Sequence, residues 1–153
     1  MTQVRFYHLE RSPLERVLPA LLERSLARGW KAVVEATSAG RLQVLDDWLW
    51  TWSDESFLAH GTARDGDEAL QPVFLTTGPE NPNAAAIRFC VEGADPAASL
   101  QAIAPYERIM VLFDGNDADA LANARQQWAA LKGSPHERTY WRQNDDGGWE
   151  KKA

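Results

Sequence analysis

The sequence predicts an α/β fold, in which a mostly parallel β-sheet is flanked by helices. Short segments rich in β-branched and aromatic residues alternate with segments whose apolar residues recur at helical spacing. The segment 108–115, RIMVLFDG, is nearly continuously apolar, as strands buried on both faces of a parallel sheet are. The 153 residues are the usual size of one domain and contain no internal repeats. We therefore expect a single domain over residues 1–153 with a nucleotide-binding-like topology.

The first strand and the first helix follow each other closely. Residues 4–9, VRFYHL, are rich in β-forming residues and predict a strand. Ser12 is expected to be the N-cap of the helix that follows, with Pro13 at its first position. Apolar residues then recur at helical spacing until Gly29, which is expected to end the helix. Pro19 lies inside this pattern and predicts a kink or a boundary.

The remaining elements continue the alternation. Further strands are expected at residues 30–37, 56–61, 72–77, 84–91, 108–115 and 136–143. Further helices are expected at residues 38–52, 95–103 and 117–133. Asp95 and Pro96 open the second of these helices, and Gly133 ends the third. Residues 62–70 predict a polar loop, and residues 144–153 predict a C-terminal tail.

Composition excludes several classes of function. The formal net charge of −6 argues against direct binding of nucleic acid, which depends on neutralising phosphates. The basic residues form only a small C-terminal group, Arg125, Lys132, Arg138 and Arg142. Cys90 lies in an apolar run and is expected to be a buried, reduced thiol. No apolar segment is long enough for a membrane span, and the N-terminus lacks a signal-peptide pattern, so we expect a cytoplasmic protein.

The chain lacks the sequence motifs of common catalytic and cofactor sites. The first predicted strand is followed by LERSP rather than by a glycine-rich turn, so the nucleotide site usual in such folds is not expected. The histidines are scattered without the spacing of metal ligands; they are His8, His60 and His136. We expect no catalytic residues, cofactor or metal. The alternative is a small α/β enzyme or nucleotide-binding protein with an unrecognised site.

Three tryptophans lie within five positions of the predicted helix 38–52. Helical spacing places Leu42, Leu45, Trp48, Leu49 and Trp52 on one face, which is expected to pack on the sheet. Trp50 points the other way, among polar residues that include Asp46 and Asp47. Either a loop covers Trp50, or it is an aromatic anchor for a partner protein, which Phe57 could join. Stacking on single-stranded DNA is a third possibility, but it needs cations where these aspartates lie.

The predicted helix 117–133 presents a second unusual pattern. Its inward face is formed by Ala120, Leu121, Ala124, Trp128 and Leu131. Arg125 and Lys132 border Trp128 on one flank. Two cations beside an indole suit a peptide C-terminus that ends in a hydrophobic residue. The alternative is that these cations simply cover the rim of a packed tryptophan.

Several motifs together resemble the chi subunit of bacterial DNA polymerase III. They are FYHL at 6–9, LW followed by SFLAHG at 49–61, VLFDG at 111–115, AR..W..LK at 124–132 and YWRQNDDGGWEKK at 140–152. The resemblance implies a non-catalytic accessory protein of the clamp-loader complex. Such proteins pair one-to-one with the psi subunit and bind the acidic C-terminal tail of single-stranded-DNA-binding protein. The psi-binding surface can also serve a repair helicase.

The resemblance assigns roles to particular residues. Trp50 and Phe57 match the aromatic pair that contacts psi. Arg125 matches the arginine that takes the terminal carboxylate of the tail, and Trp128 matches the aromatic beside it. The neighbouring candidates for tail binding are Lys132, Phe113 and Trp149. Leu121 stands where well-known members have a lysine, so tail binding is expected to be weaker unless Lys132 or Arg142 compensates.

Overall fold

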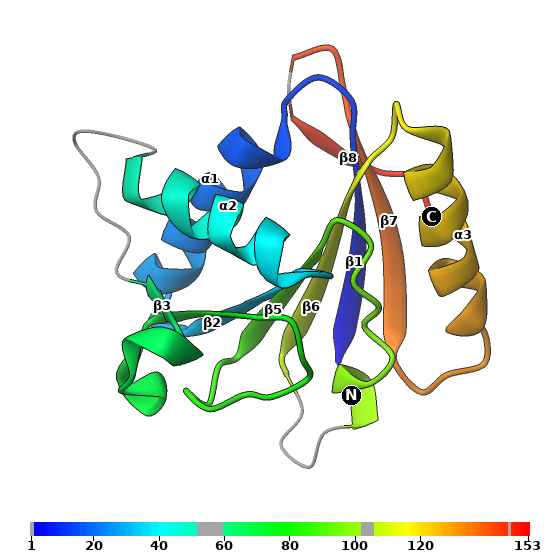
Figure 1. Ribbon diagram of the computed structural model, residues 1–153. Coiled ribbons are helices and arrows are strands. Elements are labelled where there is room, and N and C mark those ends of the chain that lie inside the picture. The colour runs from blue at the N-terminus through cyan, green and yellow to red at the C-terminus, as the bar shows by residue number, and fades with distance from the viewer. Residues whose placement is uncertain (1, 52–59, 102–105, 147) are drawn as a thin grey trace.

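The computed structural model describes residues 2–51, 60–101, 106–146 and 148–153 (Figure 1). These residues form an eight-stranded sheet in the order β3-β4-β2-β5-β6-β1-β7-β8. The strands are β1 (Gln3–Leu9), β2 (Ala32–Glu35), β3 (His60–Thr62), β4 (Val73–Thr76), β5 (Ile87–Val91), β6 (Arg108–Asp114), β7 (Glu137–Gln143) and β8 (Trp149–Lys151). The pairing of β7 with β8 is antiparallel, and the other pairings are parallel. The α/β fold is thus confirmed.

Helices cover both faces of the sheet, as Figure 1 shows. α1 (Leu14–Ala27) and α2 (Ala39–Thr51) lie on one face, and α3 (Ala118–Ala130) lies on the other. Short 3-10 turns occur at η1 (Ala63–Asp65), η2 (Glu68–Leu70) and η3 (Ser99–Gln101). The alternation of side chains along β1 divides the core, since Tyr7 and Leu9 face α1 whereas Val4 and Phe6 face α3.

Two expectations for the start of α1 are wrong, those for Ser12 and Pro13. Ser12 is not the N-cap of α1: Pro13 occupies that position without a side-chain cap. The Ser12 hydroxyl instead accepts a hydrogen bond from Gln143, whose amide oxygen accepts the backbone N–H groups of Arg11 and Ser12. Pro19 does not mark a boundary, because α1 continues through it. A contact with a distant strand thus replaces the local cap.

The C-terminal segment is not merely a tail. Within residues 144–153, β8 pairs with β7, and Trp149 lies opposite Gln143. The predicted helix 95–103 is reduced to the turn η3 in its described part, and residues 102 and 103 lie outside the described residues. Of the predicted strand 56–61, only the last two residues are described, and they open β3. Short segments of this kind carry little periodicity, so tertiary pairing decides their structure.

The helix at the site follows its sequence signals. The carboxylate of Asp117 accepts the backbone N–H groups of Asp119 and Ala120 at 2.9 and 3.1 Å, so it is the N-cap of α3. Gly133 adopts φ +79° just beyond the helix, which suits a residue without a side chain. These signals fix the start and the end of α3, and therefore the face that Trp128 presents to the sheet.

The core also contains an arginine that the sequence pattern does not reveal. Arg88 of β5 is fully buried and pairs with Glu35. Its guanidinium also donates to the Tyr106 hydroxyl at 3.0 Å and to the carbonyls of Glu80 and Gly78. The neighbouring Cys90 is buried as expected, and burial raises the pKa of its thiol to about 12. The thiol is therefore protonated and unreactive at neutral pH.

Candidate functional site

A crevice opens where the chain leaves the adjacent strands β1 and β6 in opposite directions. After β1 the chain turns to α1 on one face, and after β6 it turns to α3 on the other. Open α/β sheets bind ligands at such switch points. The crevice has a volume of about 1020 Å³, and its charged lining is mostly acidic: Glu10, Glu15, Glu92, Asp114, Asp117 and Asp119, against Arg11 and Arg41. This lining would repel phosphate groups, so it offers no support for nucleotide binding.

A cluster of aromatic rings lies between α3 and the sheet. Trp128 of α3 is half-buried and meets Phe6 and Tyr140 edge-on, with ring centroids 5.4 and 5.8 Å apart. Phe113 is buried beneath, with its ring centroid 6.0 Å from that of Tyr140 and 5.3 Å from that of His8. The rings come from β1, β6, β7 and α3, so tertiary packing positions Trp128 from several sides.

Arg138 of β7 is a cation in direct contact with Trp128. Its guanidinium carbon lies 4.2 Å from the ring centroid, and the same group donates to the Trp128 carbonyl. That carbonyl lies near the C-terminal end of α3, where a positive charge is favourable. Sequence spacing points to Arg125 and Lys132 beside Trp128, and the tertiary structure adds Arg138 from the next strand.

Arg125 is exposed on α3, three residues before Trp128. Within the part of the chain that the structure describes, its guanidinium forms no ion pair or hydrogen bond. Its charge nevertheless reaches the aromatic cluster. The pKa of His8 is lowered by burial and by the charges of Arg142 and Arg125. The pKa of Tyr140 is raised by burial, and the charge of Arg125 opposes this rise. Arg125 is thus available to an anion close to these rings.

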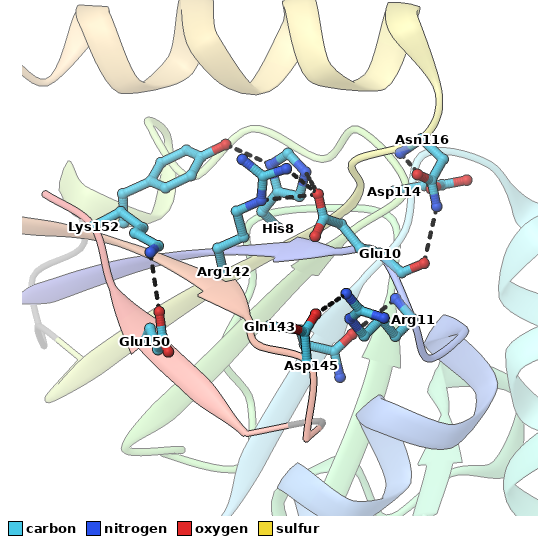
Figure 2. Close-up of polar contacts among 11 residues, drawn as sticks. His8, Glu10, Arg11, Asp114, Asn116, Arg142, Gln143, Asp145, Glu150 and Lys152 are labelled. Carbon is cyan, nitrogen blue, oxygen red and sulfur yellow. Dashed lines mark hydrogen bonds and ion pairs between the residues drawn. The ribbon is translucent and has the colours of Figure 1, made fainter.

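A polar network borders the cluster where β1 ends. Figure 2 shows the guanidinium of Arg142 directed at the carboxylate of Glu10, with which it forms an ion pair, beside the ring of His8. His8 Nε2 lies 3.3 Å from Glu10 Oε1, and the hydrogen bond from Arg142 lowers the pKa of Glu10. Arg142 is therefore already engaged. An incoming carboxylate would have to compete with Glu10 for it.

The other candidates for tail binding are not all brought together. Phe113 lies in the floor of the cluster, and Lys132 is exposed just beyond α3, without a side-chain partner among the described residues. Trp149 lies on the opposite face of the sheet, where its ring stacks on that of Tyr7 at 4.6 Å. Leu121 is half-buried against the α3 side of the core. Trp149 is thus separated from Trp128 by the sheet itself.

The two expected psi-binding residues are not described to the same extent. The backbone of Trp50 belongs to α2, but its side chain lies outside the described residues, as does Phe57 entirely. The inward face of α2 follows the helical spacing, since Leu45 and Leu49 are buried and Trp48 packs against the same core. Trp52 also lies outside the described residues.

His8 and Tyr140 belong to the site but were not predicted from the sequence. The alternation along β1 puts His8 on the same face as Phe6. The register then sets His8 between Phe113 and Arg142, and Phe6 beside Tyr140. Alternation was therefore a usable signal. The order of the strands, which makes these residues neighbours, cannot be read from alternation alone.

Comparison with known proteins identifies the family. The family model of the DNA polymerase III chi subunit, HolC, matches residues 1–139, which is most of the chain. The chain belongs to the DNA polymerase III chi family. A chi-family relative, the "probable DNA polymerase III subunit chi" of Rickettsia prowazekii (strain Madrid E), is 29% identical over 117 residues, which are 74% of this chain and 71% of the relative. Membership makes this protein a chi subunit of DNA polymerase III and a protein of DNA replication.

The chi chain shares its fold with proteins outside the family. The C-terminal domain of the DEAD-box protein Dbp5 aligns with a TM-score of 0.53 and 13% identity, covering 92% of this chain and 90% of that one. At this identity the likeness concerns the fold alone. Across the described residues, no helix has the length and apolarity needed to cross a membrane, and no group of histidine, cysteine or acidic residues could hold a metal ion.

Proposed function

We propose that this chi subunit is a non-catalytic protein bridge in the clamp-loader complex. One surface, at Trp50 and Phe57, pairs with the psi subunit. A second surface, on α3, binds the acidic C-terminal tail of single-stranded-DNA-binding protein. The protein thereby connects the polymerase to coated template without contacting DNA itself, which agrees with its net charge of −6.

The observation that carries the second surface is the unpaired guanidinium of Arg125 beside a half-buried tryptophan. Arg138 is engaged with the carbonyl of Trp128, and Arg142 is engaged with Glu10. Arg125 has no such partner in the described structure, yet its charge acts on the rings around Trp128. A terminal carboxylate bound by Arg125 would place the last apolar side chain of a peptide against these rings. Lys132 offers a second contact, to the acidic residues that precede the last apolar residue of the peptide.

Fluorescence anisotropy tests tail binding. A labelled acidic peptide with the tail sequence of single-stranded-DNA-binding protein is titrated with wild type and with Arg125→Ala, alongside the same peptide amidated at its C-terminus. We expect Arg125→Ala and amidation each to weaken binding about tenfold or more, since both remove a charge-assisted hydrogen bond. Arg64→Ala is the matched control, because Arg64 is exposed on η1, away from α3. Equal binding of both peptides would contradict the proposal.

The psi surface needs a separate test. Wild type, Trp50→Ala and Phe57→Ala are each co-expressed with psi, and the complexes are isolated by size exclusion. We expect both substitutions to reduce the yield of the complex strongly, since aromatic anchors dominate interface energies. Trp48→Ala is not a suitable control because Trp48 packs against the core. Arg41→Ala, on the same helix, is the suitable control. Loss of the complex with Arg41→Ala but not with Trp50→Ala or Phe57→Ala would argue against a psi surface at Trp50 and Phe57.

The alternative function, nucleotide binding, would use the crevice between β1 and β6. Its acidic lining disfavours phosphate. A screen of thermal stability with mononucleotides tests this alternative. A melting temperature that rises with the concentration of a nucleotide would favour nucleotide binding over a function as a protein bridge alone.

A further inference from the structure

A second cationic site lies on the face of the sheet opposite Arg125. A pocket of about 430 Å³ opens at the amino ends of β1, β5 and β6, where the C-terminal end of α1 covers them. Its floor is apolar and is formed by Tyr7, Leu21, Ile87, Phe89 and Met110. Neither the family assignment nor the proposed bridge gives this pocket a role.

Four arginines surround the pocket: Arg5, Arg24, Arg28 and Arg108. None of the described residues that line it is acidic. None of the four forms an ion pair within the described structure. In a chain with a net charge of −6, such a group of cations without carboxylates is unusual, and their mutual repulsion is unfavourable.

Arg108 is the innermost of these cations. Its Nε is buried and has no hydrogen-bond partner in the described structure. Burial and the charges of Arg5 and Arg28 lower the pKa of Arg108. A buried donor without an acceptor costs free energy, and an anion in the pocket would satisfy this donor and reduce the repulsion.

Aromatic rings lie against three of the four guanidinium groups. Arg28 lies 4.0 Å and Arg108 lies 5.4 Å from the ring centroid of Trp30, while Arg5 lies 5.4 Å from that of Trp141. A nucleobase would have to displace a guanidinium to stack on Trp30. A carboxylate, by contrast, needs only the N–H edges that such stacking leaves exposed. The site therefore suits carboxylates better than nucleic acid.

We propose that this pocket binds an acidic peptide segment in which carboxylates flank an apolar side chain. Arg108, Arg28 and Arg5 bind the carboxylates, and the apolar side chain lies on the floor beside Leu21 and Met110. Because several guanidinium groups are available, the segment needs no free chain end, unlike the ligand proposed for Arg125. The pocket is thus a second docking site for a protein partner, and it does not depend on the bridge proposed above.

The test uses a labelled pentapeptide, Glu-Asp-Phe-Asp-Glu, acetylated at one end and amidated at the other. Wild type and the double variant Arg28→Gln with Arg108→Gln are titrated by anisotropy at low salt. We expect the double variant to bind about tenfold or more weakly, and replacement of the phenylalanine by alanine to weaken binding to wild type. Arg125→Ala should bind as wild type. The matched control is the pair Arg16→Gln with Arg64→Gln, which removes the same charge at exposed positions that do not line the pocket.

A readout on wild type alone keeps the test independent of the stability of the variants. The indole N–H resonance of Trp30 is expected to shift on titration with the pentapeptide. Absence of both binding and shift would overturn the proposal. Tighter binding of an oligothymidine, lost in the same double variant, would also overturn it and assign the pocket to nucleic acid. Equal effects of inorganic phosphate would indicate an unspecific anion site instead.

Discussion

The phenol oxygen of Tyr140 lies 2.8 Å from Nδ1 of His8 and joins β7 to β1 on the α3 side of the sheet. The other ring nitrogen of His8 lies 3.3 Å from the carboxylate of Glu10. Both nitrogens of a buried imidazole are thus engaged. This contact connects the aromatic cluster under Trp128 with the ion pair of Arg142, so the stability of the candidate site depends on it.

Stability is expected to fall as the pH is lowered, with His8 as one cause. Burial and Arg142 lower the pKa of His8 in the folded state, whereas the unfolded chain keeps a value near 6.5. The unfolded state therefore binds more protons below pH 6.5, and the stabilisation is lost as the pH falls through the folded pKa. The slope from one group is at most about 1.4 kcal/mol per pH unit. Urea unfolding at pH 8 and pH 5 measures it for wild type and His8→Gln. A difference between the two proteins that stays constant with pH would contradict the assignment.

Gly115→Ala is expected to disturb the same imidazole. A Cβ at this position would lie 1.9 Å from His8 Nε2 and 2.1 Å from its Cδ2, and His8 is too buried to move aside. We expect a loss of about 1–3 kcal/mol in the free energy of unfolding, as in other overpacked cores. Gly40→Ala is the matched control, since no atom lies within 4 Å of its Cβ and Gly40 is in α2. The control is expected to stabilise the protein by up to about 1 kcal/mol. Equal effects at both glycines would contradict the prediction.

Arg88→Met is expected to destabilise the protein by about 3–5 kcal/mol, because it leaves the carboxylate of Glu35 without its partner. The substitution also removes the hydrogen bonds to Tyr106 and to two carbonyls. Burial already raises the pKa of Glu35, and loss of Arg88 should raise it further. Thermal and urea unfolding measure the change. Arg64→Met, at an exposed position, should change stability by no more than about 0.5 kcal/mol. A change below about 1 kcal/mol at Arg88 would show that the pair is dispensable.

Trp149→Ala separates a structural role from a binding role. The ring stacks on Tyr7 on the face opposite Trp128. We therefore expect a loss of stability of about 1–3 kcal/mol, less than for a fully buried tryptophan, because Trp149 is only half-buried. Binding of the acidic tail peptide should be unchanged. Weaker binding of the tail peptide with an unchanged free energy of unfolding would contradict this view. Fluorescence anisotropy measures the binding, and urea unfolding measures the stability.

Strong local patterns predicted most of the fold. The apolar run of β6 and the Gly133 stop beyond α3 are readable because each acts through its near neighbours in the chain. The failures occurred where a distant segment intervenes. Gln143 donates a hydrogen bond to the hydroxyl of Ser12, and part of the expected tail pairs with β7 as the strand β8. Arg88 reads as a polar interruption of a strand, and its burial depends on partners from three other segments.

The sequence by itself determined the three long helices and most of the strands of this protein, and it marked Arg125 and Trp128 as neighbours on one helix face. Helical spacing is local, so a short stretch of chain suffices to specify it. Only the tertiary structure decided which face of the sheet each aromatic residue occupies. It set Trp128 and Trp149 on opposite sides, and it gathered Arg5, Arg28 and Arg108 around one pocket. The physical reason is strand order, which joins segments about a hundred residues apart through packing that no local pattern encodes.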